Sequence, residues 1–226
     1  MRIRRIMLFL ICILICPLSR VWASEGGTPQ WWCRNGAFAD DQNDLHLAKV
    51  AGTKRVKFHD EGPDDGPPNA SANTDPGLRP GDRVVVSKLR GGWACVYKNL
   101  DASGWIRESD LTLLQFDTKP AIKAWAGKWD DGYGNTIAFK MTRDGKRLLA
   151  IGEAIYETPE QHHTGSFTST AEPDGNKLQI TTEDDCHVQM TLVADRLVVS
   201  DNNECGGMNV SFTGVYAKKK HAGRSR

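Results

Sequence analysis

The sequence predicts an all-β protein of two domains, the second of which is an eight-stranded antiparallel up-and-down barrel. Apolar and polar residues alternate over short runs, helical periodicity is nearly absent, and Gly, Asn and Asp separate the runs. About 200 residues follow an N-terminal leader, which is enough for two small domains.

The leader, residues 1–23, has the composition of a secretory signal peptide. Three arginines among the first five residues precede an apolar run of thirteen residues, and small residues occupy positions 21 and 23 before the expected cut. At about 1.5 Å per residue, a helix of that run is too short for a bilayer core of about 30 Å. We therefore expect cleavage before Ser24 and a periplasmic or secreted protein with no membrane span. Retention of the leader as an anchor is the alternative.

Removal of the leader changes the charge of the chain. The whole chain has a net charge of +1, whereas the part after residue 23 has 25 basic and 28 acidic residues, a net charge of −3. A basic tail, residues 218–226, holds five of those bases, so the remaining body has a net charge of −8. Nucleic-acid-binding proteins normally present a basic face, so we expect no nucleic-acid partner. The tail is expected to be a solvated terminus, with contact to an anionic wall polymer or membrane surface as the alternative.

Four cysteines remain after the leader, and their spacing predicts two disulfides. An even number of cysteines in an exported chain indicates disulfides, and four allow three pairings. A hairpin that turns at residues 195–196 places Cys186 directly opposite Cys205, as a cross-strand disulfide requires. Cys33–Cys95 follows by elimination. The absence of a Cys-x-x-Cys motif argues against a zinc site.

The first domain spans residues 31–114 and includes a long loop at residues 60–80. This loop holds five prolines and almost no apolar residue, so we expect it to contribute nothing to a core. A linker at residues 115–124, which contains Pro120, then leads to the second domain.

The second half of the first domain resembles the bacterial SH3-like (SH3b) family. The family pattern is a Gly-x-x-Val-x-Val strand, a Trp-x-x-Val strand, Gly-Trp-[Val/Ile] and a closing Leu. The matching residues are Gly81, Val84, Val86, Trp93, Val96, Gly104, Trp105, Ile106 and Leu111. The resemblance covers residues 81–114 and implies a small SH3-like barrel that binds peptidoglycan peptides or proline-containing peptides. The first half departs from the pattern, because the usual Leu-Asn-Val-Arg segment is missing.

Three aromatic residues of this region are the candidate ligand-binding residues. Trp93, Cys95 and Tyr97 alternate onto one face of a strand. SH3-like folds can line a shallow groove for extended peptides with aromatic side chains. We therefore expect such a groove at Trp93, Tyr97 and Trp105, although Cys95 on the same face indicates partial burial.

The second domain, residues 125–217, shows eight candidate strands separated by Gly-containing turns. Eight consecutive antiparallel strands favour a closed barrel, which removes exposed edges. Gly127-Lys128-Trp129 is similar to the Gly-x-Trp that opens lipocalin- and avidin-like barrels. The expected strands are 125–130, 136–142, 147–156, 164–170, 177–182, 186–193, 196–200 and 210–216. The expected core residues are Ile137, Phe139, Leu149, Ile151, Leu178, Ile180, Met190 and Leu192.

No catalytic, metal or cofactor motif is present in the sequence. His162 and His163 are adjacent, so on a strand they would point to opposite faces and would not share a metal ion. Two acidic segments, 184–185 and 201–204, are expected at the same end of the predicted hairpin. They could hold calcium, but they lack EF-hand spacing and are common turn formers. We therefore predict no enzyme, no metal site and no cofactor.

These expectations favour an exported bacterial envelope protein that binds rather than catalyses. The leading hypothesis is that the SH3-like domain contacts peptidoglycan or an envelope protein. A second hypothesis is a periplasmic inhibitor or immunity protein of a cell-wall hydrolase, since the acidic body could meet a basic enzyme. A third is a small-ligand carrier that uses the second barrel, which would require a hollow interior.

Overall fold

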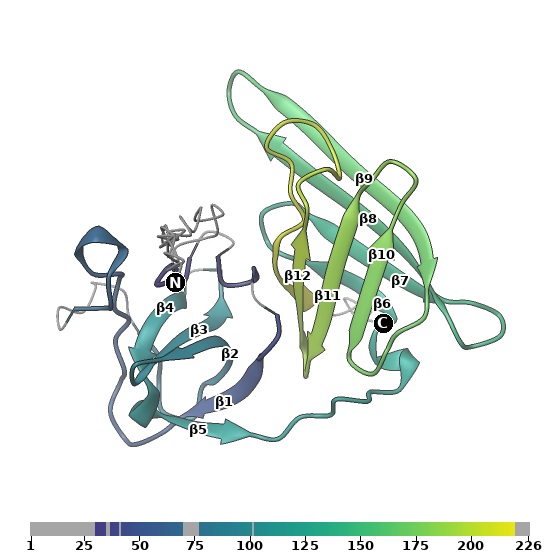
Figure 1. Ribbon diagram of the computed structural model, residues 1–226. Coiled ribbons are helices and arrows are strands. Elements are labelled where there is room, and N and C mark those ends of the chain that lie inside the picture. The colour runs from purple at the N-terminus through teal and green to yellow at the C-terminus, as the bar shows by residue number, and fades with distance from the viewer. Residues whose placement is uncertain (1–29, 35–36, 41, 70–76, 101, 220–226) are drawn as a thin grey trace, which may run out of the picture.

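The computed structural model describes residues 30–34, 37–40, 42–69, 77–100 and 102–219, and it is all-β as predicted (Figure 1). A five-stranded antiparallel sheet is followed by a nearly closed eight-stranded antiparallel barrel. The predicted leader and residues 220–226 of the basic tail lie outside the described residues. No helix of the described ranges is both long and apolar enough to cross a membrane.

The five-stranded unit has the strand order β4-β3-β2-β1-β5, with all neighbours antiparallel. Four of its strands contain the residues that carry the SH3b resemblance or begin at one of them. The sequence did not reveal β1, which lies between β2 and β5 and buries Leu47, Ala48 and Val50. The strands are β1 (His46–Val50), β2 (Arg83–Arg90), β3 (Trp93–Asn99), β4 (Ala102–Arg107) and β5 (Leu111–Leu114). Short 3-10 turns, η1 (Pro63–Asp65) and η2 (Glu108–Asp110), lie in the connections.

The loop at residues 60–80 contributes to the core, which corrects the expectation from its composition. Leu78 is fully buried beside Phe58, and the backbones of Val56 and Leu78 form two hydrogen bonds. One apolar residue at the end of the loop is therefore enough to fasten it to the sheet.

The barrel contains the eight predicted strands, most of them within one or two residues of the expected bounds. The last strand begins four residues later than expected, because residues 210–213 form a loop. The 3-10 turn η3 (Ile122–Ala124) precedes the barrel. The strands are β6 (Gly127–Asp130), β7 (Thr136–Met141), β8 (Leu148–Glu157), β9 (His162–Ala171), β10 (Lys177–Thr181), β11 (His187–Val193), β12 (Arg196–Asp201) and β13 (Gly214–Lys218).

The barrel closes between its first and last strands and lacks a hydrogen-bonded ladder along one seam. β13 pairs with β6, whereas β9 and β10 are the two ends of the strand order and share no ladder. Side chains fill the interior, and the largest of them are Trp125, Trp129, Ile137, Met190, Phe212 and Tyr216. These buried side chains lie where the carrier hypothesis would require a hollow interior.

Two residues expected in the barrel core lie on its outer face instead. In β8 the buried positions are Leu148, Ala150, Gly152 and Ala154, so Leu149 and Ile151 point outward and are half-buried. The run from 148 to 151 is apolar at every position, so its pattern did not reveal which alternate residues face inward.

The five-stranded unit packs against the outer face of β11, β12 and β13. Val193, Val198 and Val215 project from these strands into the same cluster as Leu47 and Val85. Gln42 adds hydrogen bonds from its side-chain amide to the carbonyl of Gln189 and the hydroxyl of Ser200. The two units thus share a buried apolar interface.

Candidate functional site

The structure brings Trp93, Tyr97 and Trp105 together, but it does not leave them open as a groove. Trp93 is 4% exposed, Trp105 is fully buried, and Tyr97 is half-buried against the barrel. The Tyr97 hydroxyl lies 3.4 Å from the carbonyl oxygen of Val215. The aromatic face of the small sheet is therefore occupied by the protein itself.

The N-terminal segment covers the rest of this aromatic face. The indole of Trp31 packs on Trp105, with ring centroids 5.2 Å apart, and the Trp105 indole N–H donates to the carbonyl of Trp31. The predicted disulfide Cys33–Cys95 is present and ties this segment to β3, with a Cα–Cα distance of 5.6 Å. On Trp93, the Arg107 guanidinium lies 3.7 Å from the ring centroid.

A different part of the molecule presents side chains to solvent on ordered backbone. We call it the loop end of the barrel and define it as residues 131–135, 182–187 and 202–213. In Figure 1 these connections lie at the end of the barrel away from η3. Its three segments come from far apart in the sequence and are joined by side-chain hydrogen bonds.

The first segment, residues 131–135, is held by a buried carboxylate and a buried amide. Asp131 accepts hydrogen bonds from the backbone N–H groups of Tyr133 and Asn135 and from the side-chain amide of Asn135. Asn135 also donates to the carbonyl of Ser211 and accepts from the N–H of Ile155. Burial raises the pKa of Asp131 above its usual value in spite of these donors. The hydrogen bonds of Asp131 and Asn135 therefore hold the turn that carries Tyr133 in place.

The third segment, residues 202–213, is anchored by Asp201 at the end of β12. Its carboxylate accepts from the hydroxyls of Ser211 and Thr213 and from the backbone N–H of Phe212. At the other side of the loop, the N–H of Gly207 donates to the carbonyl of Thr164 in β9. This loop is therefore tied down on both sides of its tip.

The second disulfide joins the last two segments. Cys186 and Cys205 are bonded, with a Cα–Cα distance of 4.6 Å, as the sequence predicted. The hairpin turns at residues 194–195, one position earlier than expected, so Cys205 reaches Cys186 from a bend beyond β12 instead of from a strand.

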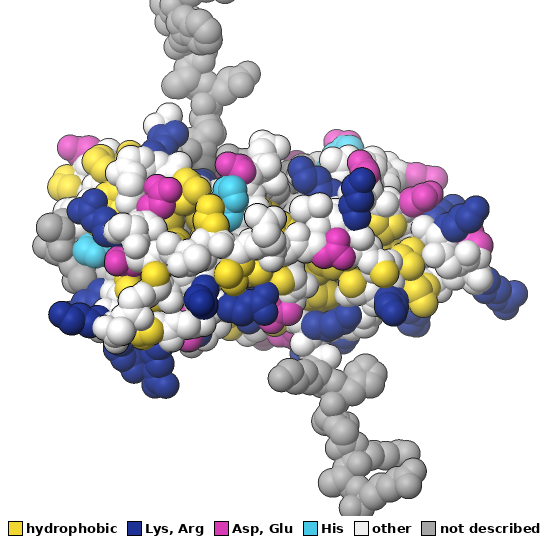
Figure 2. Space-filling view, turned by 90° about the horizontal axis from the view of Figure 1, so that it is seen from below, with side chains coloured by type: hydrophobic (Ala, Val, Ile, Leu, Met, Phe, Trp, Pro, Cys, Tyr) yellow, Lys and Arg dark blue, Asp and Glu magenta, His cyan; other side chains and the backbone are white. Residues whose placement is uncertain are grey.

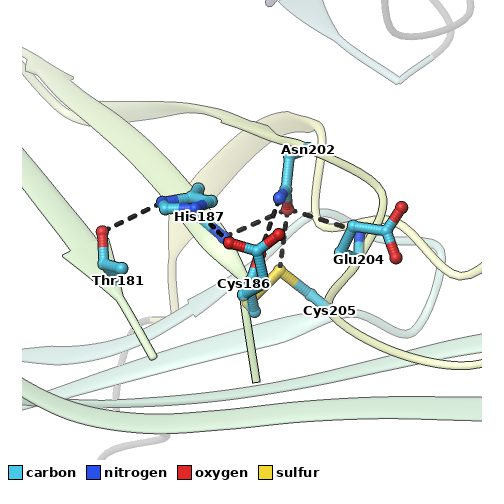
Figure 3. A network of polar contacts seen from close by, with 7 residues as sticks. Thr181, Cys186, His187, Asn202, Glu204 and Cys205 are labelled. Atoms are coloured by element: carbon cyan, nitrogen blue, oxygen red, sulfur yellow. Dashed lines mark hydrogen bonds and ion pairs between the residues drawn. A yellow bond between two sulfur atoms is a disulfide. The ribbon is translucent and has the colours of Figure 1, made fainter. Parts of the chain in front are cut away.

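Asn202 and His187 connect the backbone around this disulfide (Figure 3). The Asn202 side chain accepts from the N–H of His187 and donates to the carbonyl of Asp185. The His187 ring lies between the Thr181 hydroxyl at 3.0 Å and the Asp185 carboxylate at 2.9 Å. Asp185, His187 and Thr181 all lie at the exposed surface, so the network orders the loop at a solvent-exposed position.

Two large side chains stand out from the ordered loops. Tyr133 is 74% exposed and Met208 is 70% exposed, although most side chains of their size are buried. Tyrosine and methionine are enriched in protein–protein interfaces, where they serve as anchors. Sequence reasoning did not identify either residue. The available signal was a large apolar residue inside a Gly-containing turn, in Asp131-Gly-Tyr-Gly134 and Gly206-Gly-Met-Asn209.

An open depression of about 820 Å³ borders the same loops. Gly134 and Gly206 line it beside the turns of Tyr133 and Met208. Three carboxylates also line it, from Glu153, Asp184 and Glu204, together with the strand residues Thr164, Ser166 and Thr168. The acidic segments therefore meet at one end of the barrel as expected. No cluster of three or more metal-ligating side chains occurs within the described ranges.

The negative charge of the chain is concentrated in the barrel. Residues 125–217 contain seven Lys and Arg against fourteen Asp and Glu, a net charge of −7. The view from below, in Figure 2, shows Lys and Arg side chains spread along that face with acidic and apolar side chains between them. The carboxylates that line the depression, from Glu153, Asp184 and Glu204, belong to this excess of negative charge.

No family model, curated protein or solved structure matches the chain.

Proposed function

We propose that this chain is an exported envelope protein that binds a cationic protein partner through the loop end of its barrel. The observation that carries the proposal is the pair of exposed anchors, Tyr133 and Met208, on loops fixed by Asp131, Asp201 and a disulfide. Loops that are ordered before binding lose little conformational entropy in a complex. The acidic depression beside them adds electrostatic attraction for a basic surface.

The five-stranded unit acts in this proposal as a support for the barrel. Its resemblance to the SH3b family is consistent with five antiparallel strands, but its aromatic face is covered by the N-terminal segment and by Val193, Val198 and Val215. A protein partner is therefore better supported than a wall peptide in that groove. The predicted signal peptide and two disulfides support an oxidising compartment, the periplasm or the exterior.

The partner class that fits best is a basic cell-wall hydrolase, with this chain as its inhibitor or immunity protein. A rigid protruding loop beside an acidic depression can contact the rim of an enzyme cleft and oppose its positive charge. This function requires no catalytic group of its own.

The test is binding and inhibition with a panel of basic lysozymes and amidases. We expect slower hydrolysis by at least one enzyme, and an affinity that falls as salt is raised. The double variant Tyr133→Ala/Met208→Ala should weaken that binding at least tenfold and leave the melting temperature unchanged. Met141→Ala removes an exposed methionine at the opposite end of β7 and is the matched control. Unchanged hydrolysis rates across the panel, with sedimentation of the chain on purified peptidoglycan, would instead support the wall-binding hypothesis.

A further inference from the structure

The charges of the barrel are divided unevenly between one turn and the rest of its surface. Four of the seven Lys and Arg residues of 125–217 lie in and beside the turn between β7 and β8, at Lys140, Arg143, Lys146 and Arg147. We call residues 140–147 the basic turn. It holds one acidic residue, so its net charge is +3, whereas the remainder of the barrel has three basic and thirteen acidic residues, a net charge of −10. In Figure 1 the turn projects at the side of the barrel away from the five-stranded unit.

The basic turn has an ordered backbone. The N–H of Thr142 donates to the carbonyl of Arg147, and the N–H of Gly145 donates to the carbonyl of Thr142. The Asp144 carboxylate accepts hydrogen bonds from the Thr142 hydroxyl and from the N–H of Lys146. All four cations are exposed, and within the described ranges none of them is in a salt bridge. The turn therefore presents concentrated positive charge on a fixed backbone.

The acidic depression at the loop end has the opposite charge. Its three carboxylates, from Glu153, Asp184 and Glu204, are exposed, and none of them is in a salt bridge with another described residue. Asp130, by contrast, is paired with Lys219. Among the described residues that line the depression, none is Lys or Arg. Its volume of about 820 Å³ opens to solvent, so side chains of another molecule can enter it.

The cations at the tip of the basic turn cannot reach Glu153 of their own molecule. Arg147 directly precedes β8, which pairs with β9 along its whole length and with β7 over its first six residues. A strand rises about 3.3 Å per residue, so the six steps from Arg147 to Glu153 span about 20 Å. Lys146 lies one residue farther away. A contact between these tip cations and Glu153 therefore requires two molecules.

A second copy of the chain supplies the complementary surface. The basic turn of one copy, placed in the depression of another, would bring its cations beside three carboxylates that have no salt-bridge partner among the described residues. The part of the chain after residue 23 has a net charge of only −3, and salt screens repulsion beyond about 8 Å at physiological ionic strength. Attraction at the contact therefore outweighs the net repulsion between copies.

We infer that the chain associates with itself head to tail, with the basic turn of one copy in the acidic depression of the next. Such a contact joins two different surfaces, so each added copy leaves one turn and one depression free for further growth. The inference goes beyond the proposed function and does not require a hydrolase partner. Both use the same depression, however, so an enzyme bound at the loop end would compete with the turn of a second copy.

Sedimentation equilibrium of the chain without its leader tests for association. We expect the weight-average mass to rise above that of a monomer as the protein concentration rises. Because charge drives the contact, the dissociation constant should increase at least tenfold when salt is raised from about 0.05 M to about 0.5 M. A monomer at every concentration in low salt would overturn the inference, as would an association that salt does not weaken.

Two neutralising variants identify the surfaces that meet. Each variant alone should associate at least tenfold more weakly than the native chain. An equal mixture should form one-to-one dimers, because the turn variant keeps an intact depression and the depression variant keeps an intact turn. No dimer in the mixture would overturn the head-to-tail contact. The variants are Arg143→Ser/Lys146→Ser/Arg147→Ser in the turn and Glu153→Gln/Asp184→Asn/Glu204→Gln in the depression, and the matched control is Lys119→Ser/Lys123→Ser/Lys128→Ser, at exposed positions outside the basic turn.

Zero-length cross-linking of the native chain tests the contact without any substitution, and so decides the matter if a variant does not fold. A carbodiimide condenses a Lys amine and a carboxylate into an amide with loss of water. In an equal mixture of isotope-labelled and unlabelled chains, we expect Lys146 joined to Glu153, Asp184 or Glu204 in peptide pairs of which one member is labelled. Intermolecular cross-links that all lie elsewhere would overturn the inference.

The two proposals fail in different ways. If the chain stays monomeric but slows a hydrolase, and Tyr133→Ala/Met208→Ala weakens that binding, head-to-tail association is wrong and the loop end remains the partner site. If the chain associates through the turn and the depression but binds no enzyme of the panel, the proposed hydrolase partner is wrong. A dimer that survives both neutralising variants would show a different interface, which would overturn the inference.

Discussion

The side-chain amide of Asn135 donates a hydrogen bond to the backbone carbonyl of Ser211, 3.2 Å away, across 76 residues of sequence. This contact joins the turn that carries Tyr133 to the loop that carries Met208. Tyr133 and Met208 therefore lie on two segments that one buried side chain joins.

Asn135→Ala should destabilise the barrel. The change leaves Asp131 without one donor and the N–H of Ile155 without its acceptor, and a buried polar group without its partner costs about 1–3 kcal/mol. Urea unfolding should show a loss of about 2 kcal/mol or more. Asn99→Ala, at an exposed position of β3, should change little. Equal stability of the two variants would contradict the structural role of Asn135.

The adjacent carboxyls Asp130 and Asp131 should give opposite dependences of stability on pH. The hydrogen bond from Lys219 holds the pKa of Asp130 below 3.8, so its contribution is present above pH 3.8 and is lost as the pH falls through its folded pKa. Burial raises the pKa of Asp131 above 3.8, so its contribution is present below pH 3.8 and is lost as the pH rises through its folded pKa.

Urea unfolding of Asp130→Asn and Asp131→Asn from pH 2.5 to pH 7 separates these contributions. The difference in free energy of unfolding between the native chain and Asp130→Asn should increase as the pH rises. The difference between the native chain and Asp131→Asn should decrease over the same range. Differences that stay constant over this range would argue against both shifts.

The two disulfides should differ in their effect on stability. Cys33–Cys95 spans 62 residues and Cys186–Cys205 spans 19, and a longer closed loop restricts the unfolded chain more. Chain-entropy arguments give losses of about 4 kcal/mol for Cys33→Ser/Cys95→Ser and about 3 kcal/mol for Cys186→Ser/Cys205→Ser. Thermal or urea unfolding of the two double variants checks the order. A larger loss from the shorter loop would show that native contacts of the loop end dominate.

Val198→Asp should separate the two units without unfolding the barrel. Val198 is fully buried at the interface, whereas its neighbours Leu197 and Val199 face the barrel core. An unpaired charge would be buried in the docked state, so the units should part and expose the segment at residues 115–124 to proteases. Ile151→Asp places the same charge on another outer face of the barrel and should leave cleavage unchanged. Equal cleavage of both variants would mean that the interface is weaker than its burial indicates.

Local patterns predicted the strand positions and the Cys186–Cys205 disulfide well, because both depend on residues close together in the sequence. Cys33–Cys95 followed only by elimination, because its cysteines are 62 residues apart. The hairpin that turns at residues 194–195 brings Cys186 and Cys205 together, although the sequence predicted its turn one position later. The apolar run at residues 148–151 could not show its register, since both alternations through it are apolar.

The contacts between distant segments were beyond local patterns. Nothing near Trp93 or Trp105 in the sequence shows that Trp31 and the three outward valines of the barrel would cover them. The same reason hid the loop end, where Asn135 donates a hydrogen bond to Ser211 across 76 residues. The sequence reasoning placed the acidic segments together correctly only because one hairpin connects them.

The three valines on the outer face of β11, β12 and β13 limit how the two units can be exchanged between proteins. A gene fragment that encodes only residues 125–219 would produce a barrel with Val193, Val198 and Val215 in water, and such a patch favours self-association. Recombination at the linker would succeed only with a neighbour that offers an equally apolar sheet. We therefore expect the two units to be inherited together, although the linker at residues 115–124 looks like a domain boundary.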